Sequence, residues 1–186
     1  MLILLPPSEG KSTPRRGKPL APDELSFPSL TPARSQALEA LVDLCGTDPE
    51  LAARTLGLGT TQIDEVRRNH HLPASPTARA DAIYTGVLYD ALDLASLDAA
   101  SRRRASRSLA VTSSLFGLLL PGDRIPSYRL AGGVNLPGIG VISAHWRDVL
   151  DPVVREAAGK GLVVDLRSTT YAAFWRPEPD LARRVA

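Results

Sequence analysis

A segment in the second half of the chain, TSSLFGLLLPGDRIPSYRL, carries residue types that can bind or react with a ligand. Ser113 and Ser114 follow the apolar run 109–112, which has the pattern of a short buried strand. Small residues at the end of a strand let a ligand approach the backbone closely. The segment then turns at a Pro-Gly-Asp sequence and ends in Tyr128 and Arg129. This arrangement is typical of a binding site rather than of a plain core segment.

The strand predicted at 161–166 leads to a second group of polar residues, Asp165 and Ser168. Because ligands of open α/β sheets bind at the carboxyl ends of the strands, we expect one polar pocket there that accepts a small anion. A structural ion pair between Asp165 and an arginine is the alternative. The residues predicted to form the pocket are Ser8, Lys11, Ser113, Ser114, Tyr128, Arg129 and Ser168. The candidates for catalysis are Lys11, Tyr128, Arg129 and Asp165.

The N-terminal loop SEGKS, residues 8–12, resembles the second half of a phosphate-binding loop. The full pattern requires a glycine where this chain has Leu5, and Pro14 blocks the helix that should follow. A site for a nucleoside triphosphate is therefore not expected. The sequence is compatible with a contact between Lys11 and an anion, and an ordinary loop is the alternative.

A glycine turn, LGLG at 56–59, separates two predicted helices and resembles the hairpin of a helix-hairpin-helix element. Gly57 and Gly59 permit a tight turn, after which Thr60 would begin a helix whose free N–H groups point at a phosphate. Such contacts hold DNA without reading its sequence. An ordinary turn between two helices is the alternative. The flanking arginines that would reach DNA are Arg54, Arg67 and Arg68.

Arginine makes up 19 of the 22 basic residues, and its side chain favours bidentate contacts with phosphate. Arg102, Arg103, Arg104 and Arg107 lie on the polar helix predicted at 98–107. Because Arg103, Arg104 and Arg107 share one face of that helix, they predict a stripe that binds the DNA backbone. A solvated helix surface is the alternative. The net charge is only +2, so a basic surface depends on how the charges are separated in space.

The sequence predicts no metal site and no cofactor. His70, His71 and His145 have no cysteine or acidic partner at the spacing of metal ligands, and His145 is expected to cap a helix. The single cysteine, Cys45, allows no disulfide within the chain and lies in an apolar helical pattern. A buried structural thiol is the expected role, and a peroxide-sensing thiol is the alternative.

Strands alternate with helices unevenly, which favours an α+β fold over a regular doubly wound sheet. One helix should begin at a capping Thr31 and end at Gly46, and Asp48 should cap the next. Residues 8–30 have the composition of an extended loop, and the glycine-rich segment 132–141 that of a β-hairpin. The other strands are expected at 2–5, 109–112 and 161–166, and the other helices at 98–107 and 145–158. Residues 80–92 are expected to form a turn that leads into a helix, and residues 169–175 a short helix or a turn.

The chain of 186 residues has the length and the 44% hydrophobic fraction of a single domain with a substantial core. Its N-terminal apolar run is too short for a signal peptide, and no run approaches the length of a membrane span. We therefore expect a cytoplasmic protein that does not bind membranes.

Five motifs resemble, in order and spacing, those of the YaaA peroxide-stress family. They are MLILLPPSEGK at the N-terminus, YTGVLYDAL from residue 84, SSLFGLLLPGDRIPSYRL from residue 113, HWRDVL from residue 145 and VVDLRSTTYAAFW from residue 163. The resemblance implies a cytoplasmic bacterial protein that limits oxidative damage. It also implies a mixed sheet with surrounding helices, a helix-hairpin-helix element and a positively charged cleft that binds DNA.

Members of that family usually continue beyond the position of Ala186 with another strand and a basic segment. We therefore expect one YaaA-like domain over residues 1–186, without that C-terminal part. The first hypothesis is a peroxide-stress protein that binds duplex or branched DNA without sequence specificity. The second is an enzyme acting on a small anionic substrate, in which Lys11 or Tyr128 handles protons. The pocket of that enzyme would be built from Ser8, Lys11, Ser114, Tyr128, Arg129 and Asp165.

Overall fold

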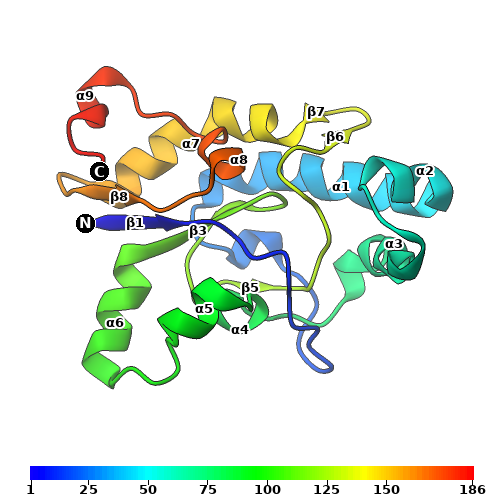
Figure 1. Cartoon of the computed structure of the whole chain (residues 1–186), viewed down its shortest axis with the longest axis horizontal. Coiled ribbons are helices and arrows are strands. Elements are labelled where there is room, and N and C mark those ends of the chain that lie inside the picture. Colours follow the sequence, from blue (N-terminus) through cyan, green and yellow to red (C-terminus); the bar gives the residue numbers. More distant parts are fainter.

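A computed structural model shows a protein built on a four-stranded mixed sheet (Figure 1). The structure describes residues 1–186, except for the side chain of Thr60. The strands lie in the order β4-β3-β1-β8, with β1 parallel to both β3 and β8, and β4 antiparallel to β3. Their bounds are Leu2–Leu5 for β1, Leu109–Ser113 for β3, Gly117–Leu119 for β4 and Val163–Asp165 for β8. The carboxyl ends of three parallel strands therefore meet at one edge.

The three predicted strands are confirmed, and β1 and β3 are apolar runs because they lie in the interior of the sheet, whereas β8 forms one of its edges. All five residues of β3 are buried, as expected for a strand covered on both faces. The sheet is mixed and helices surround it, so the α+β fold is confirmed.

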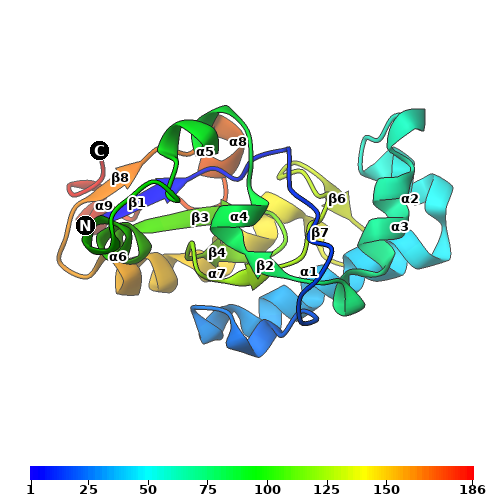
Figure 2. The same cartoon turned by 90° about the horizontal axis from the view of Figure 1, so that it is seen from below.

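Helices cover both faces of the sheet (Figure 2). The long helices α1, Thr31–Thr47, and α7, Ile142–Ala158, lie on one side, and the short helices α5, Val87–Leu92, and α8, Thr169–Ala172, lie on the other. Both views place α6, Ala99–Ser108, at one end of the molecule and the pair α2–α3 at the opposite end.

The start of α1 differs from its prediction. Thr31 is the first helical residue rather than the cap, and the preceding Leu30 makes no capping hydrogen bond through its side chain. The helix also continues through Gly46 to Thr47, where Asp48 begins α2, Pro49–Thr55, by accepting a hydrogen bond from the Leu51 N–H. Residues 8–30 are not wholly extended, because they contain 3₁₀ turns at Pro22–Glu24 and Pro28–Leu30.

Arg34 on α1 is a buried structural residue that the sequence did not identify. Its guanidinium donates to the carbonyl oxygens of Phe116 at 3.0 Å and Leu118 at 2.8 Å, on either side of the start of β4. It also donates to Ser26 at 2.8 Å, which ties the N-terminal loop to the sheet. Burial lowers the pKa of Arg34 to about 10, and its hydrogen bonds offset the cost of removing the charge from water.

The long helix α7 begins at Ile142, so His145 lies inside its first turn and does not cap it. The Nε2 atom of His145 is instead hydrogen bonded to the carbonyl of Ala33, 2.9 Å away on α1. The neighbouring Trp146 donates from its indole to the carbonyl of Ser114 at 2.7 Å. Its ring also lies so close to Gly117, at φ +72°, that no side chain would fit there.

The remaining elements are short. The strands β6, Asn135–Leu136, and β7, Gly140–Val141, confirm the predicted hairpin, and β2, Ala78–Arg79, pairs with β5, Arg124–Ile125. Near the C-terminus, Val185 forms a parallel bridge with Val163 of β8. The other helices are α3 at Asp64–His70, α4 at Ala80–Ile83 and α9 at Pro179–Ala182, with 3₁₀ turns at Thr60–Gln62 and Leu72–Ala74. None of the described helices has the length and apolar character needed to cross a bilayer.

Candidate functional site: a pair of cations beside a tyrosine cluster

The candidate site lies at the edge where the parallel strands end. β1 leads into the loop 8–12, and β3 ends at Ser113. The loop is fixed against the segment before α5, since Ser12 N–H donates to Ile83 O at 2.8 Å and Thr85 N–H donates to Ser8 Oγ at 3.0 Å. The structure thus brings segments from three distant parts of the chain together, at the position where open sheets bind ligands.

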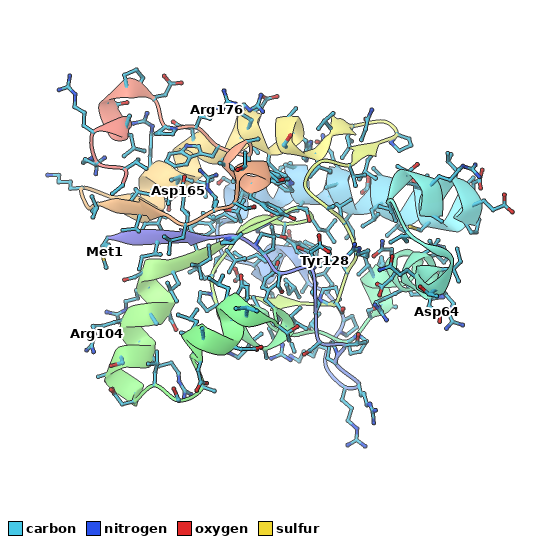
Figure 3. All side chains as sticks on the ribbon, in the orientation of Figure 1. Met1, Asp64, Arg104, Tyr128, Asp165 and Arg176 are labelled. Carbon is cyan, nitrogen blue, oxygen red and sulfur yellow. The ribbon has the colours of Figure 1, made fainter. Side chains whose placement is uncertain are left out.

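Tyr128 is the centre of the site and is fully buried (Figure 3). Its hydroxyl is hydrogen bonded to Ser113 Oγ at 2.8 Å and to the hydroxyl of Tyr84 at 3.0 Å. Burial raises the pKa of Tyr128, and its hydrogen bonds to Ser113 and Tyr84 reverse only part of that effect. Tyr128 therefore stays protonated at neutral pH and holds the site together through its hydroxyl.

Lys11 lies against the face of Tyr128, with its ammonium nitrogen 4.5 Å from the ring centre and 5.7 Å from that of Tyr84. The ammonium group donates to the carbonyl oxygen of Ser8 at 2.8 Å. Burial lowers the pKa of Lys11 to about 8, and the charge of Arg129 lowers it in the same direction, while Glu65 and Glu9 oppose both effects. Lys11 can therefore exchange a proton near neutral pH.

Arg129 is the second cation, and its side chain is only 21% exposed. Its Nη1 lies 3.5 Å from Glu9, whose side chain is 85% exposed, so this ion pair is loose. The Nε of Arg129 is buried and has no hydrogen-bond partner among the described residues. Buried donors are nearly always satisfied, so this one marks a place where a ligand oxygen can bind.

The backbone of Arg129 is held by α3, because Asn69 donates from Nδ2 to its carbonyl at 2.7 Å and accepts from its N–H at 2.9 Å. Asn69 is fully buried. This side chain fixes where Arg129 leaves the backbone, and it links α3 to the site. No local pattern in the sequence predicted the contact, since 60 residues separate the two partners.

Sequence reasoning also missed the aromatic part of the site. Tyr84 and Tyr89 stack with ring centres 5.4 Å apart, and Tyr89 donates to the carbonyl of Pro6 at 2.7 Å. Burial raises the pKa of Tyr171, and its interaction with Tyr128 raises it further, which places Tyr171 in the same cluster. All four tyrosines of the chain therefore gather at this edge. The repeated tyrosine in YTGVLY was the available signal for two of them.

Asp165 is not a free carboxylate, which corrects its prediction as a candidate for catalysis. Both of its oxygens accept from Arg167, at 2.8 and 2.7 Å, so the alternative of a structural ion pair is correct. Burial alone would raise the pKa of Asp165, but the hydrogen bonds and charge of Arg167 lower it on balance. Arg167 is itself buried and also donates to the carbonyls of Tyr171 and Trp175.

The three serines other than Ser113 have mainly structural contacts. Ser114 is buried and donates to the carbonyl of Leu130 at 2.6 Å. Ser8 is partly buried, and its hydroxyl donates to Gly10 O within the loop. Ser168 is exposed and precedes α8, where its carbonyl accepts from the backbone of Tyr171. Of the predicted pocket, the structure therefore brings together Lys11, Ser113, Tyr128 and Arg129, with Ser8 at the rim.

The glycine turn is left-handed at Gly57, with φ +65°, as a tight turn between two helices requires. Gly59 N–H donates to the side chain of Gln62 at 3.2 Å, so this donor is already used. A 3₁₀ turn precedes α3, and the first turn of α3 carries the acidic residues Asp64 and Glu65. The side chain of Thr60, named above as a helix start, lies outside the described residues.

The arginines that flank this turn are all paired on their own helices. Arg54 lies 3.8 Å from Glu50, Arg67 lies 3.5 Å from Asp64, and Arg68 forms an ion pair with Glu65. Such pairs are weak where they are exposed, but each carboxylate reduces the local positive potential.

The arginines of α6 have different surroundings. Arg103 and Arg107 line a groove of about 1090 Å³ between α6 and the α4–α5 segment, and within the described part of the chain neither forms a hydrogen bond or ion pair. The opposite wall of this groove includes Tyr84 and Tyr89. Tyr84 therefore takes part both in the wall of this groove and in the surroundings of Lys11.

The predicted DNA-binding residues do not form one surface. Figure 3 shows Arg104 on α6 and Asp64 on α3 at opposite ends of the molecule, with Tyr128 between them. The described residues also include no group of three or more histidines, cysteines and carboxylates that could hold a metal ion. Cys45 is buried, and burial raises its pKa to about 11.

Comparison with known proteins identifies the same family as the five sequence motifs. The family described as "Peroxide stress protein YaaA" matches residues 1–186. A UPF0246 protein of Streptomyces coelicolor is 55% identical over 186 residues, which cover 100% of this chain and 72% of the relative. A UPF0246 protein of Corynebacterium glutamicum is 40% identical over 189 residues, covering 100% and 74%. An uncharacterised protein of Campylobacter jejuni is 27% identical over 180 residues, covering 96% and 72%. The chain therefore belongs to the YaaA family of peroxide stress proteins.

Proposed function

We propose that this peroxide stress protein works by binding a small anionic ligand between Lys11 and Arg129. The observation that carries the proposal is the unpartnered Nε of Arg129 beside a second buried cation. Two positive charges removed from water raise the free energy of the empty site, and a bound anion offsets that cost. The only carboxylate described in contact with Arg129 is the loosely held Glu9.

The site also supports proton transfer to or from the bound ligand. An amine with a pKa of about 8 is present in both protonation states near neutral pH, which suits a general acid or base. Tyr128 is kept protonated by burial, so we assign it to positioning Lys11 through its ring and not to proton transfer. The proposed enzyme thus uses Lys11 for chemistry and Arg129 for binding, and it does not use Asp165.

The test is complementation of a peroxide-sensitive strain that lacks this protein. Lys11→Met and Arg129→Met should abolish protection against hydrogen peroxide while the purified variants remain folded. The matched control is Lys18→Met, because Lys18 is exposed. Full protection by both site variants would overturn the proposal.

DNA binding without sequence specificity is the second candidate function, and one observation favours it. Arg103 and Arg107 lie side by side on α6, along a groove and without described partners. Such a pair can contact successive phosphates of a DNA strand. The glycine turn would supply a separate contact, at the other end of the molecule.

Gel-shift assays at low salt distinguish these two contributions to DNA binding. The double variant Arg103→Glu/Arg107→Glu should weaken binding to duplex and branched DNA. The slope of log K against log[salt] should also become shallower, by about 0.9 for each phosphate that the protein no longer neutralises. Gly57→Val tests the glycine turn separately, because its left-handed backbone strongly favours glycine. If neither variant changes DNA binding, this second candidate is wrong.

A further inference from the structure

The charges around Lys11 and Arg129 suggest which class of anion the site takes. Both cations are at least largely buried, and each is close enough to the other for Arg129 to lower the pKa of Lys11. Glu65 is already paired with Arg68, so Glu9 is the one nearby carboxylate without another described ion pair. The local charge is therefore +1 when Glu9 is in contact with Arg129 and +2 when Glu9 moves away.

Glu9 is placed so that it can leave the site. Its side chain is 85% exposed, its contact with Arg129 measures 3.5 Å, and it belongs to the loop 8–12. The backbone of that loop is fixed on both sides of Glu9 by bonds to Ile83 and Thr85, so the side chain can move without the loop. Moving this carboxylate away from Arg129 into water costs little free energy, because an exposed ion pair contributes little to stability.

We propose that the site binds the dianionic group of a phosphate monoester, which takes the place of the Glu9 carboxylate beside Lys11 and Arg129. This inference rests on the proposed function. A monoanion that replaces Glu9 leaves the charge balance unchanged, whereas a dianion neutralises both cations. The phosphate replaces the charge of Glu9, which contacts Nη1, and it can bind with two oxygens along the other edge of the guanidinium, which holds the unpartnered Nε together with Nη2. The lysine ammonium can bind a third oxygen. A phosphodiester of a DNA backbone carries only one negative charge, so it neutralises only one of the two cations.

Three sources share this chemistry: inorganic phosphate, a nucleoside 5′-monophosphate and the terminal phosphate of a nucleic-acid strand. They can be told apart, because a nucleoside or a strand adds contacts beyond the phosphate. Tyr89, which is partly exposed and lines the neighbouring groove, is placed to contact a base.

The experiment uses the whole, unmodified protein with its lysines labelled with ¹³C at Cε, so that NMR follows Lys11, Lys18 and Lys160 separately. Phosphate, methyl phosphate and sulfate, all dianions at pH 7.5, should shift the Lys11 signal and bind at least about 10-fold more tightly than dimethyl phosphate, a monoanion. The affinity for methyl phosphate should fall as the pH drops below the second pKa of this monoester, about 6, whereas sulfate affinity should not.

Two variants test the role of Glu9. Glu9→Gln should raise the affinity for phosphate several-fold, and the matched control Glu50→Gln should leave it unchanged, since Glu50 is exposed on α2 and pairs only with Arg54. Adenosine 5′-monophosphate and oligonucleotides with a 5′-phosphate or a 5′-hydroxyl identify the source. Equal affinities for monoanions and dianions would overturn this inference but leave the proposed function standing. If no anion shifts the Lys11 signal, both are wrong.

Discussion

The cations in the centre of this protein differ from those on its end helices. Lys11 and Arg129 are largely buried and close to each other, and one guanidinium nitrogen has no described partner. Arg54 and Arg67 are exposed and lie beside carboxylates of their own helices. Charge that is buried without compensation is available for a ligand, whereas exposed and paired charge mainly keeps a surface soluble. The comparison therefore places the best-supported site in the centre.

A third kind of cation, represented by Arg167, is buried and paired with a carboxylate. Its substitution is expected to give the largest loss of stability. Arg167→Met would leave Asp165 without its partner, while the side chain of Asp165 is only 20% exposed. Removing one member of such a pair typically costs about 3 kcal/mol or more. Urea unfolding should show this loss for Arg167→Met, and a change within about 0.5 kcal/mol for Arg107→Met on exposed α6. Similar losses in both variants would remove the distinction between the two classes of arginine.

The second prediction concerns the dependence of stability on pH. The pKa of Lys11 falls from 10.5 to about 8 on folding. Between these values the unfolded chain holds a proton that the folded protein has released, so raising the pH favours the folded state. The free energy of unfolding of the wild type should therefore rise by about 2 kcal/mol relative to Lys11→Met between about pH 7.5 and 9.5.

Exposed Lys160 provides the control for this pH dependence. Lys160→Met should follow the wild-type profile of unfolding free energy against pH, because its side chain has no comparable burial. Parallel profiles for the wild type and Lys11→Met would mean that the Lys11 amine is fully hydrated in the folded protein. The central site would then no longer differ from the end helices in the burial of its cations.

The third prediction tests how α3 positions Arg129. Asn69→Leu would leave the backbone N–H and carbonyl of Arg129 unpaired, at a cost of about 2 kcal/mol in the free energy of unfolding. Anion affinity should also fall in this variant, since Arg129 loses its anchor. Asn135→Leu is the control, because Asn135 is exposed on β6. A stability loss without any loss of anion affinity would show that Asn69 is only structural.

Local patterns were enough to predict the three parallel strands and one end of the site, but not β4, β2 or β5. The apolar run 109–112 and the polar residues after it predicted a strand leading to a site, and Ser113 does contact Tyr128. An ion pair between Asp165 and an unspecified arginine was one of two open alternatives, and the structure identifies the partner as Arg167.

The other half of the site depends on contacts that no local pattern contains. Lys11 and Tyr128 were predicted to share a pocket, but their contact through the face of the ring depends on β1 lying beside β3, which no local pattern shows. The same holds for Asn69 and the backbone of Arg129. Positions in space also decide which arginines form a group, and the structure separates those of α6 from those of α2 and α3.

The smallest expected effect belongs to Cys45, the one thiol of a peroxide stress protein. Peroxide reacts with the thiolate, and burial raises the pKa of Cys45 to about 11, so almost no thiolate exists at neutral pH. Cys45→Ser should therefore leave survival in hydrogen peroxide unchanged, and mass spectrometry should find no oxidised Cys45 in wild-type protein treated with peroxide. Loss of protection in this variant, with folding and anion affinity intact, would move the functional centre from the two cations to the thiol.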